Sequence, residues 1–137
     1  MIDQTDLEII RCLQINSRLQ WKEIGQKVHL TGQAVAARIR KMEDLKVIKG
    51  FTVNIDLEKL GQPITALVTV FMKTTDHQSF QRFINNTEAI AEAHRVSGDG
   101  CYWLKLNVTD QEKLNQLLDE ILKFGVYRVN LSIGKVK

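Results

Sequence analysis

The sequence predicts a mixed α+β protein in which three helices are followed by a β-α-β-β-α-β region. Two observations predict this order. Apolar residues recur at helical spacing over the first 46 residues, whereas from Phe51 onward several segments alternate apolar and polar residues, as half-buried strands do. The chain has 137 residues, of which 44% are hydrophobic and 26% charged, so it is too apolar to be wholly disordered and has room for one domain or two small ones.

The first 46 residues predict three short helices around one core. The first begins at Asp3 or Thr5, the second covers 21–28, and the third runs from about Gly32 to Lys46 with Thr31 as its N-cap. Apolar residues at helical spacing are expected to face the core, namely Leu7, Ile9, Ile10, Leu13, Trp21, Ile24, Val28, Val35, Ile39 and Met42. Two helices joined by a short turn and supported by a third predict a helix-turn-helix at about 21–46.

The rest of the chain predicts strands and two further helices. A linking strand is expected at 51–55, and strands of a sheet at 66–73, about 90–97, 102–108 and 127–133. Helices are expected at 79–86 and after Thr109, where Thr109-x-x-Glu112 is typical of a capping box and Gly125 ends the helix.

This order is that of the ferredoxin-like βαββαβ fold, a four-stranded sheet with two helices on one face. We expect a second copy to bury the uncovered face, which predicts a homo-oligomer. The only proline, Pro63, and Gly61 mark the expected boundary. The predicted domains are therefore 1–50, with the helix-turn-helix; 51–63, the linker strand and hinge; and 64–137, the βαββαβ domain.

Basic residues are concentrated in the first part of the chain. The net charge of the whole chain is +3, but from Arg18 to Lys49 there are eight basic and three acidic residues. A local basic excess is what a surface that faces nucleic-acid phosphates needs. A solvated helical face is the alternative explanation of the charge alone.

The third helix carries side chains suited to base contacts on its outer face. Four residues point away from the predicted core and a fifth lies on the flank, namely Gln33, Ala37, Arg40, Lys41 and Arg38. Glutamine pairs with adenine, arginine contacts guanine or phosphate, and alanine contacts the thymine methyl group, while the small Ala36 and Ala37 permit close approach. An ordinary amphipathic helix with a solvated outer face is the alternative.

Taken together, these motifs resemble the Lrp/AsnC family, the leucine-responsive and asparagine-synthetase regulators. The resemblance covers nearly the whole chain. It is carried by Asp3-x-x-Asp6-x-x-Ile9-Ile10, Asn16-Ser17-Arg18, Glu23-Ile24-Gly25, Leu30-Thr31, Val35-x-x-Arg38-Ile39-x-x-Met42-Glu43, Val47-Ile48-Lys49-Gly50-Phe51, Leu60-Gly61 and Val96-Ser97-Gly98-Asp99. Two mild departures are Gly32, where proline is common, and Lys46, where glycine usually stands.

The resemblance implies a sequence-specific DNA-binding transcriptional regulator. Its partners would be double-stranded DNA and further copies of itself, as a homodimer that assembles into a tetramer or octamer. Thr31 stands where the family usually has the serine that caps the recognition helix, and Arg38 matches the recurrent recognition-helix arginine. The expected DNA-binding residues are Lys22, Thr31, Gln33, Ala37, Arg38, Arg40 and Lys41.

An amino acid is the effector that the resemblance implies. In the family, a turn of the form Gly-Asp-x-Asp-Tyr lies at the amino-acid site between subunits, and the candidate effector residues here are Gly98, Asp99, Gly100, Cys101 and Tyr102. Cysteine replaces the second acid, which removes one charged hydrogen bond. The alternative is a plain hairpin turn.

Two other functions stay open at this point. One is an architectural protein that bends or wraps DNA without an effector; the other, more remote, is a small-molecule sensor or enzyme on the ferredoxin-like domain. The sequence contains no catalytic set, and the spacing of its histidines and cysteines suits no metal, so we expect neither an enzyme nor a metal or cofactor. No apolar run reaches the length of a membrane helix, and the expected location is the cytoplasm, in association with the nucleoid.

Overall fold

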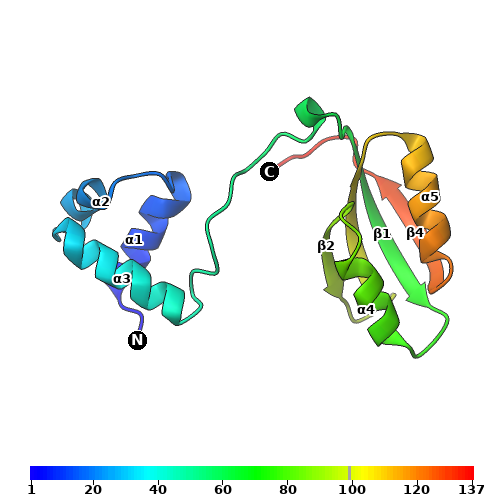
Figure 1. Cartoon of the computed structure of the whole chain (residues 1–137), viewed down its shortest axis with the longest axis horizontal. Coiled ribbons are helices and arrows are strands. Elements are labelled where there is room, and N and C mark those ends of the chain that lie inside the picture. Colours follow the sequence, from blue (N-terminus) through cyan, green and yellow to red (C-terminus); the bar gives the residue numbers. More distant parts are fainter. Residues whose placement is uncertain (99) are drawn as a thin grey trace. The chain divides into compact units, whose positions relative to one another are not determined.

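The computed structural model describes residues 1–98 and 100–137 and confirms the predicted α+β fold class (Figure 1). The chain forms two compact units, Met1–Asn54 and Ile55–Lys137. The first unit contains only helices, and the second contains the sheet and two helices.

Three helices make up the first unit: α1 (Gln4–Ile15), α2 (Trp21–Val28) and α3 (Gly32–Asp44). Their shared core consists of Ile9, Ile24, Val28, Val35, Ile39 and Met42. Two predicted core residues lie outside it, since Leu7 is 41% exposed and Trp21 48% exposed. Asp6 and Ile9 lie on the buried side of α1, so Leu7 faces outward. Trp21 is exposed because it is the first residue of α2 and lies at the edge of a small core.

The ends of these helices follow the capping residues in the sequence. Asp3 caps α1, and Thr31 caps α3 as predicted, its hydroxyl oxygen accepting a hydrogen bond from the amide of Ala34 at 3.1 Å. The predicted end of α3 at Lys46 is wrong by two residues. Lys46 instead adopts the left-handed conformation with φ 60°, which ends the helix at Asp44.

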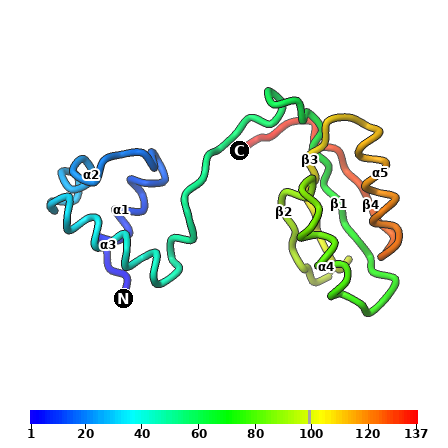
Figure 2. The backbone as a smooth tube through the Cα atoms, in the orientation of Figure 1, coloured from blue at the N-terminus to red at the C-terminus, as the bar shows by residue number. Residues whose placement is uncertain are grey.

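An antiparallel four-stranded sheet forms the base of the second unit. It contains β1 (Ile64–Met72), β2 (Ile90–Arg95), β3 (Tyr102–Val108) and β4 (Gly125–Leu131) in the order β2-β3-β1-β4. Both α4 (His77–Asn85) and α5 (Gln111–Ile121) pack on one face, as the backbone trace shows (Figure 2). The predicted ferredoxin-like arrangement is thus confirmed, and neither α4 nor α5 packs on the other face of the sheet.

Two predicted helix-end signals in this unit are wrong. Asp110, not Thr109, caps α5, and its carboxylate accepts a hydrogen bond from the amide of Lys113 at 2.8 Å. Gly125 does not end the helix but begins β4. A side chain there would bring its Cβ within 2.3 Å of the carbonyl oxygen of Phe71, so the glycine permits the close pairing of β4 with β1.

The predicted linking strand at 51–55 is absent from this structure. Residues 51–55 are extended without a paired strand, and Phe51, Val53 and Ile55 are each about half exposed or more. A strand needs the hydrogen bonds of a neighbour, and no strand among the described residues pairs with this segment. A 3-10 turn, Glu58–Leu60, follows.

Within the part of the chain that the structure describes, none of the helices combines the length and apolar character required to cross a membrane.

Candidate nucleic-acid interface

A tight turn joins α2 to α3. His29 ends α2 in the left-handed conformation, with φ 61°. Gly25 lies against the turn so closely that a Cβ there would be 2.3 Å from the carbonyl oxygen of Leu30. A larger residue at Gly25 would push the two helices apart, so the glycine sets how α3 is held against α2.

One side of α3 is buried in the core, and the other side is exposed to solvent. Val35, Ile39 and Met42 are buried in the core, whereas Gln33, Ala37 and Arg40 are exposed. Ala36 is only 4% exposed, so the expectation that it permits approach from outside is wrong: it packs inside the unit. Lys22 is exposed near the start of α2. Neither Lys22 nor Arg40 has an ion-pair partner among the described residues.

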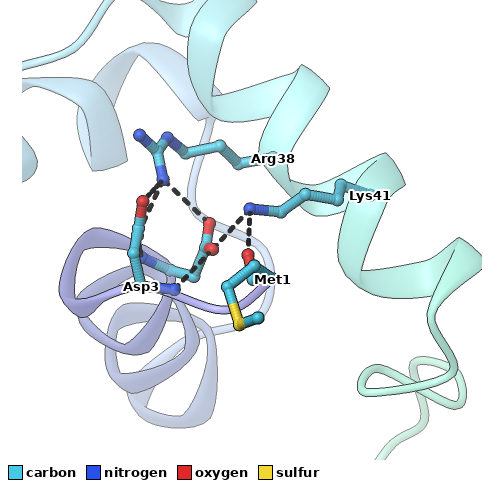
Figure 3. Close-up of polar contacts among 5 residues, drawn as sticks. Met1, Asp3, Arg38 and Lys41 are labelled. Atoms are coloured by element: carbon cyan, nitrogen blue, oxygen red, sulfur yellow. Dashed lines mark hydrogen bonds and ion pairs between the residues drawn. The ribbon is translucent and has the colours of Figure 1, made fainter.

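Arg38 and Lys41, also expected at the DNA, reach to the start of α1 (Figure 3). Nη1 of Arg38 donates to both carboxylate oxygens of Asp3, at 2.8 and 2.7 Å, and to Oδ1 of Asp6 at 3.1 Å. Nζ of Lys41 donates to Oδ2 of Asp6 and to the carbonyl oxygen of Met1. All three hydrogen bonds of Arg38 use Nη1, so its Nε and Nη2 have no partner among the described residues.

Asp6 is the centre of this cluster. Its side chain is fully buried, and burial alone would oppose its ionisation. The hydrogen bonds from Lys41, from the amide of Asp3 and from Arg38 outweigh burial and lower the pKa of Asp6 to about 2. The carboxylate is therefore ionised at neutral pH and fixes both basic side chains.

The pKa values of Asp3 and Arg38, the other two members of the cluster with shifted pKa values, change in the directions that their contacts favour. The hydrogen bond from Arg38, followed by that from the amide of Asp6, lowers the pKa of Asp3. The same contacts with Asp3 and then Asp6 raise the pKa of Arg38. Sequence analysis missed both acids as partners. The available signal was the position of Asp6, three residues before Ile9 on the apolar face of α1.

The comparisons with known proteins agree with this architecture. Residues 2–43 match the model of the AsnC-type helix-turn-helix domain, and residues 65–134 match that of the Lrp/AsnC ligand binding domain. The chain belongs to the Lrp/AsnC family. As the sequence predicted, it is a helix-turn-helix transcriptional regulator.

The relatives of this Lrp/AsnC regulator cover nearly its whole length. The Bacillus subtilis transcriptional regulator LrpB is 50% identical over 136 residues, which are 99% of this chain and 91% of LrpB. LrpA of the same organism is 38% identical over 98% of this chain and 100% of its own. The solved structure of B. subtilis LrpC superposes with a TM-score of 0.94 at 29% identity, covering 100% of this chain and 98% of LrpC.

The residues of the candidate effector turn of the regulator lie in different environments. Gly98 is exposed, whereas Tyr102 is 2% exposed in the core beneath the helices. The amide of Cys101 donates to the carbonyl oxygen of Val70 at 2.8 Å, which binds the turn to the end of β1. Asp99 lies outside the described residues.

Backbone conformation gives the two glycines of this turn a structural role. Gly98 and Gly100 have φ values of 85° and 90°, which favour glycine. A Cβ at Gly100 would also lie 2.5 Å from the methyl group of Thr69. The glycines are thus required by the turn itself, whether or not a ligand binds there.

No group of three or more His, Cys, Asp or Glu side chains within 1–98 and 100–137 is arranged to hold a metal ion.

Proposed function

We propose that this regulator contacts double-stranded DNA through the outer face of α3. Gln33, Ala37 and Arg40 lie at base edges, and Lys22 binds a phosphate. The observation that supports this most is the exposure of Gln33, Ala37 and Arg40 on the side of α3 opposite the core. Glutamine and arginine are the side chains that contact adenine and guanine through paired hydrogen bonds.

Arg38 contacts the same DNA while Asp3 holds it. Since Asp3 and Asp6 engage only Nη1, the Nε and Nη2 groups of Arg38 are available to a base or phosphate. A guanidinium that is already held loses less conformational freedom on binding. Thr31 contributes by fixing the start of α3, and Lys41 contributes the weakest contact because it must release Asp6 to reach a phosphate.

The two parts of the chain have different functions. Residues 1–50 bind DNA, 51–63 act as linker, and 64–137 assemble the oligomer and bind the effector. The regulator acts as a homodimer that assembles further into a tetramer or octamer, in association with the nucleoid. A dimer places two recognition helices at half-sites about one helical turn, or a multiple of it, apart.

Support for assembly comes from the sheet face opposite α4 and α5. Leu67, Phe71 and Trp103 lie on this face, and Arg128 stands over the ring of Phe71 at 5.7 Å. The alternating apolar residues of 51–55 also lack a partner strand. Burial of both features by a second copy removes apolar area from water.

An amino acid modulates the regulator through the ligand binding domain, with Gly98, Asp99, Gly100, Cys101 and Tyr102 as the candidate contacts. The match of residues 65–134 to that domain supports an effector. The cysteine at position 101 favours the second candidate, an architectural protein that bends or wraps DNA without an effector.

A selection from a random-sequence DNA library tests the proposal. The regulator should enrich a two-fold motif, and Arg40→Ala should weaken binding to that motif by roughly 5- to 150-fold at fixed salt. The matched control is Lys27→Ala, which removes a charge that is also exposed, near the end of α2. Equal affinity for unrelated duplexes would favour the architectural candidate, and no effect of Arg40→Ala would contradict the assigned face.

A further inference from the structure

The side chain of Trp21 is only partly covered by the core of the helical unit. It stands on the apolar stripe of α2, three residues before Ile24 and seven before Val28, and both of those side chains are buried. Trp21 itself is 48% exposed, because the stripe extends past the core at the first residue of the helix. About half of a large aromatic side chain therefore meets solvent at the start of α2.

The start of α2 adjoins the start of α3. A Cβ at Gly32, the first residue of α3, would lie 3.3 Å from the amide nitrogen of Lys22 and 3.6 Å from the carbonyl carbon of Trp21. In a helix-turn-helix, the first residues of the second helix contact base edges, while the first helix crosses the sugar-phosphate backbone. Since α2 is the first helix of this motif, Trp21 lies beside the DNA backbone when the outer face of α3 enters the groove.

The charges around this indole favour an anionic partner. Lys22 follows it and Arg18 lies three residues before it; both are exposed, and neither has an ion-pair partner among the described residues. Glu23 is the only acidic residue within 9–42 of the sequence. Its carboxylate binds its own helix, since Oε1 accepts a hydrogen bond from the amide of Gln20 at 3.3 Å. A phosphate beside this surface meets two cations and an acid that is already engaged.

We propose that Trp21 is a further DNA contact, in which its ring packs against a deoxyribose and its Nε1–H donates a hydrogen bond to a phosphate oxygen of the double strand. Indole combines a large apolar surface with one donor and no acceptor, and the DNA backbone places apolar sugar carbons beside oxygens that only accept. The contact is uncharged and independent of base sequence. It rests on the proposed function for the position of α3 and extends the interface to the first residue of α2.

Tryptophan fluorescence tests the contact directly, because the chain has only two tryptophans, Trp21 and Trp103. In the full-length variant Trp103→Phe, Trp21 is the only indole. Its emission should change as a duplex carrying the selected motif is added, and its quenching by acrylamide should decrease. The anisotropy of labelled duplex shows when the protein is saturated. Unchanged emission and unchanged quenching of Trp21 at saturation would overturn the proposal.

Affinity measurements test whether the contact contributes to binding. Trp21→Ala should weaken DNA binding about tenfold, and Trp21→Phe should weaken it less because the ring remains. The factor should be the same for the selected motif and an unrelated duplex at fixed salt. The matched control is Leu45→Ala, which shortens an apolar side chain of similar exposure at the C-cap of α3 and should bind as wild type does. A loss confined to the selected motif, or equal losses for Trp21→Ala and Leu45→Ala, would overturn the proposal.

The salt dependence of binding separates a direct contact from an effect through Lys22. Lys22→Ala should reduce the slope of log affinity against log salt by about one, because it removes a charge that displaces a counterion. Trp21→Ala should lower the affinity and leave this slope unchanged, because indole carries no charge. A slope reduced as in Lys22→Ala would mean that Trp21 only positions that lysine, and would overturn the direct contact.

The proposed function and this inference fail in different ways. If Arg40→Ala keeps full affinity while DNA changes the emission of Trp21, the assigned face of α3 is wrong and the contact of Trp21 stands. If Arg40→Ala weakens binding and Trp21→Ala does not, only the contact of Trp21 is wrong. Urea unfolding of each variant separates loss of folding from loss of contact, and the fluorescence of Trp21 needs no substitution at that residue. A smaller oligomer in Trp21→Ala with unchanged DNA affinity would assign the indole to an interface between copies and overturn the proposal.

Discussion

Nη1 of Arg38 lies 2.7 Å from Oδ2 of Asp3, so α3 is linked to the N-cap of α1 by a pair 35 residues apart in sequence. The same Asp3 also caps α1, and its Oδ1 accepts a hydrogen bond from the amide of Asp6 at 2.9 Å. One carboxylate therefore both starts a helix and orients an arginine of α3, the helix that we propose faces DNA.

Asp3→Asn should weaken DNA binding although it removes a negative charge. The amide side chain keeps an oxygen for the cap but loses its ion pair with Arg38, so the arginine is no longer held. We expect a several-fold loss of affinity for the selected motif, measured by fluorescence anisotropy. Asp44→Asn, at an exposed acid near the end of α3, is the charge-matched control. A rise in affinity for Asp3→Asn would mean that Asp3 keeps Arg38 away from DNA.

Arg38→Ala should reduce specific affinity by roughly 5- to 150-fold and leave the oligomer intact. Because Asp3 and Asp6 lose a counter-charge, the helical unit should also lose some stability. Sedimentation and urea unfolding separate these effects from DNA binding. An unchanged footprint at matched salt, with the variant still folded, would remove Arg38 from the interface.

Asp6→Asn should destabilise the helical unit by about 2 kcal/mol, measured by urea unfolding. The figure is below the 3–5 kcal/mol of a fully buried pair, because Lys41 and Arg38 are still partly in contact with water. Asp44→Asn is again the control. A loss below about 0.5 kcal/mol would show that the cluster contributes little to stability.

Acid should destabilise the same unit through Asp6. Its pKa of about 2 lies below the ordinary value of 3.8, so the folded form holds the ionised carboxylate more firmly. This contribution is fully present above about pH 5 and is lost progressively as the pH falls through 3.8 and then through 2, about 2 kcal/mol in all. The stability difference between wild type and Asp6→Asn should therefore narrow over that interval. A difference independent of pH would contradict this assignment.

Lys46→Gly should stabilise the helical unit. Lys46 has φ 60°, which strains a residue with a Cβ, and glycine at this position relieves the strain. The expected gain is about 0.5–1 kcal/mol in urea unfolding. Lys49→Gly, three residues on and without a positive φ, should give no gain. Equal effects of the two substitutions on the free energy of unfolding would show that the positive φ of Lys46 does not destabilise the unit.

Leu67→Asp should reduce the oligomeric state. Leu67 lies on the sheet face opposite α4 and α5 and pairs with Lys105 and Asn130, and a charge there resists burial by a second copy. Light scattering should show a smaller species than wild type. The matched control, Leu122→Asp, places the same charge at an exposed leucine at the end of α5. Unchanged assembly in both variants would exclude this face as the interface.

The sequence by itself determined the order of the elements and the family. These features follow from local patterns: the helical spacing over 4–44, the period-two alternation in the sheet strands and the Thr31 cap. Local patterns depend only on residues close together in the sequence. The prediction of a linking strand at 51–55 was wrong for the opposite reason, because a β-strand forms only when it pairs with a neighbouring strand. The cap of α5 was missed by one residue, since Thr109 and Asp110 carry equivalent oxygens and only the backbone path selects Asp110.

Only the tertiary structure decided which basic side chains of α3 are free. A helical wheel places Arg40 and Lys41 toward solvent and Arg38 on the flank, but Asp3 and Asp6 lie 32 to 35 residues away from Arg38 and Lys41 and are brought beside them by the packing of α1 against α3. Likewise, Tyr102 and His77 meet through the contact of α4 with the sheet. Charge pairs over such separations depend on the folded geometry, which no periodicity in the sequence records.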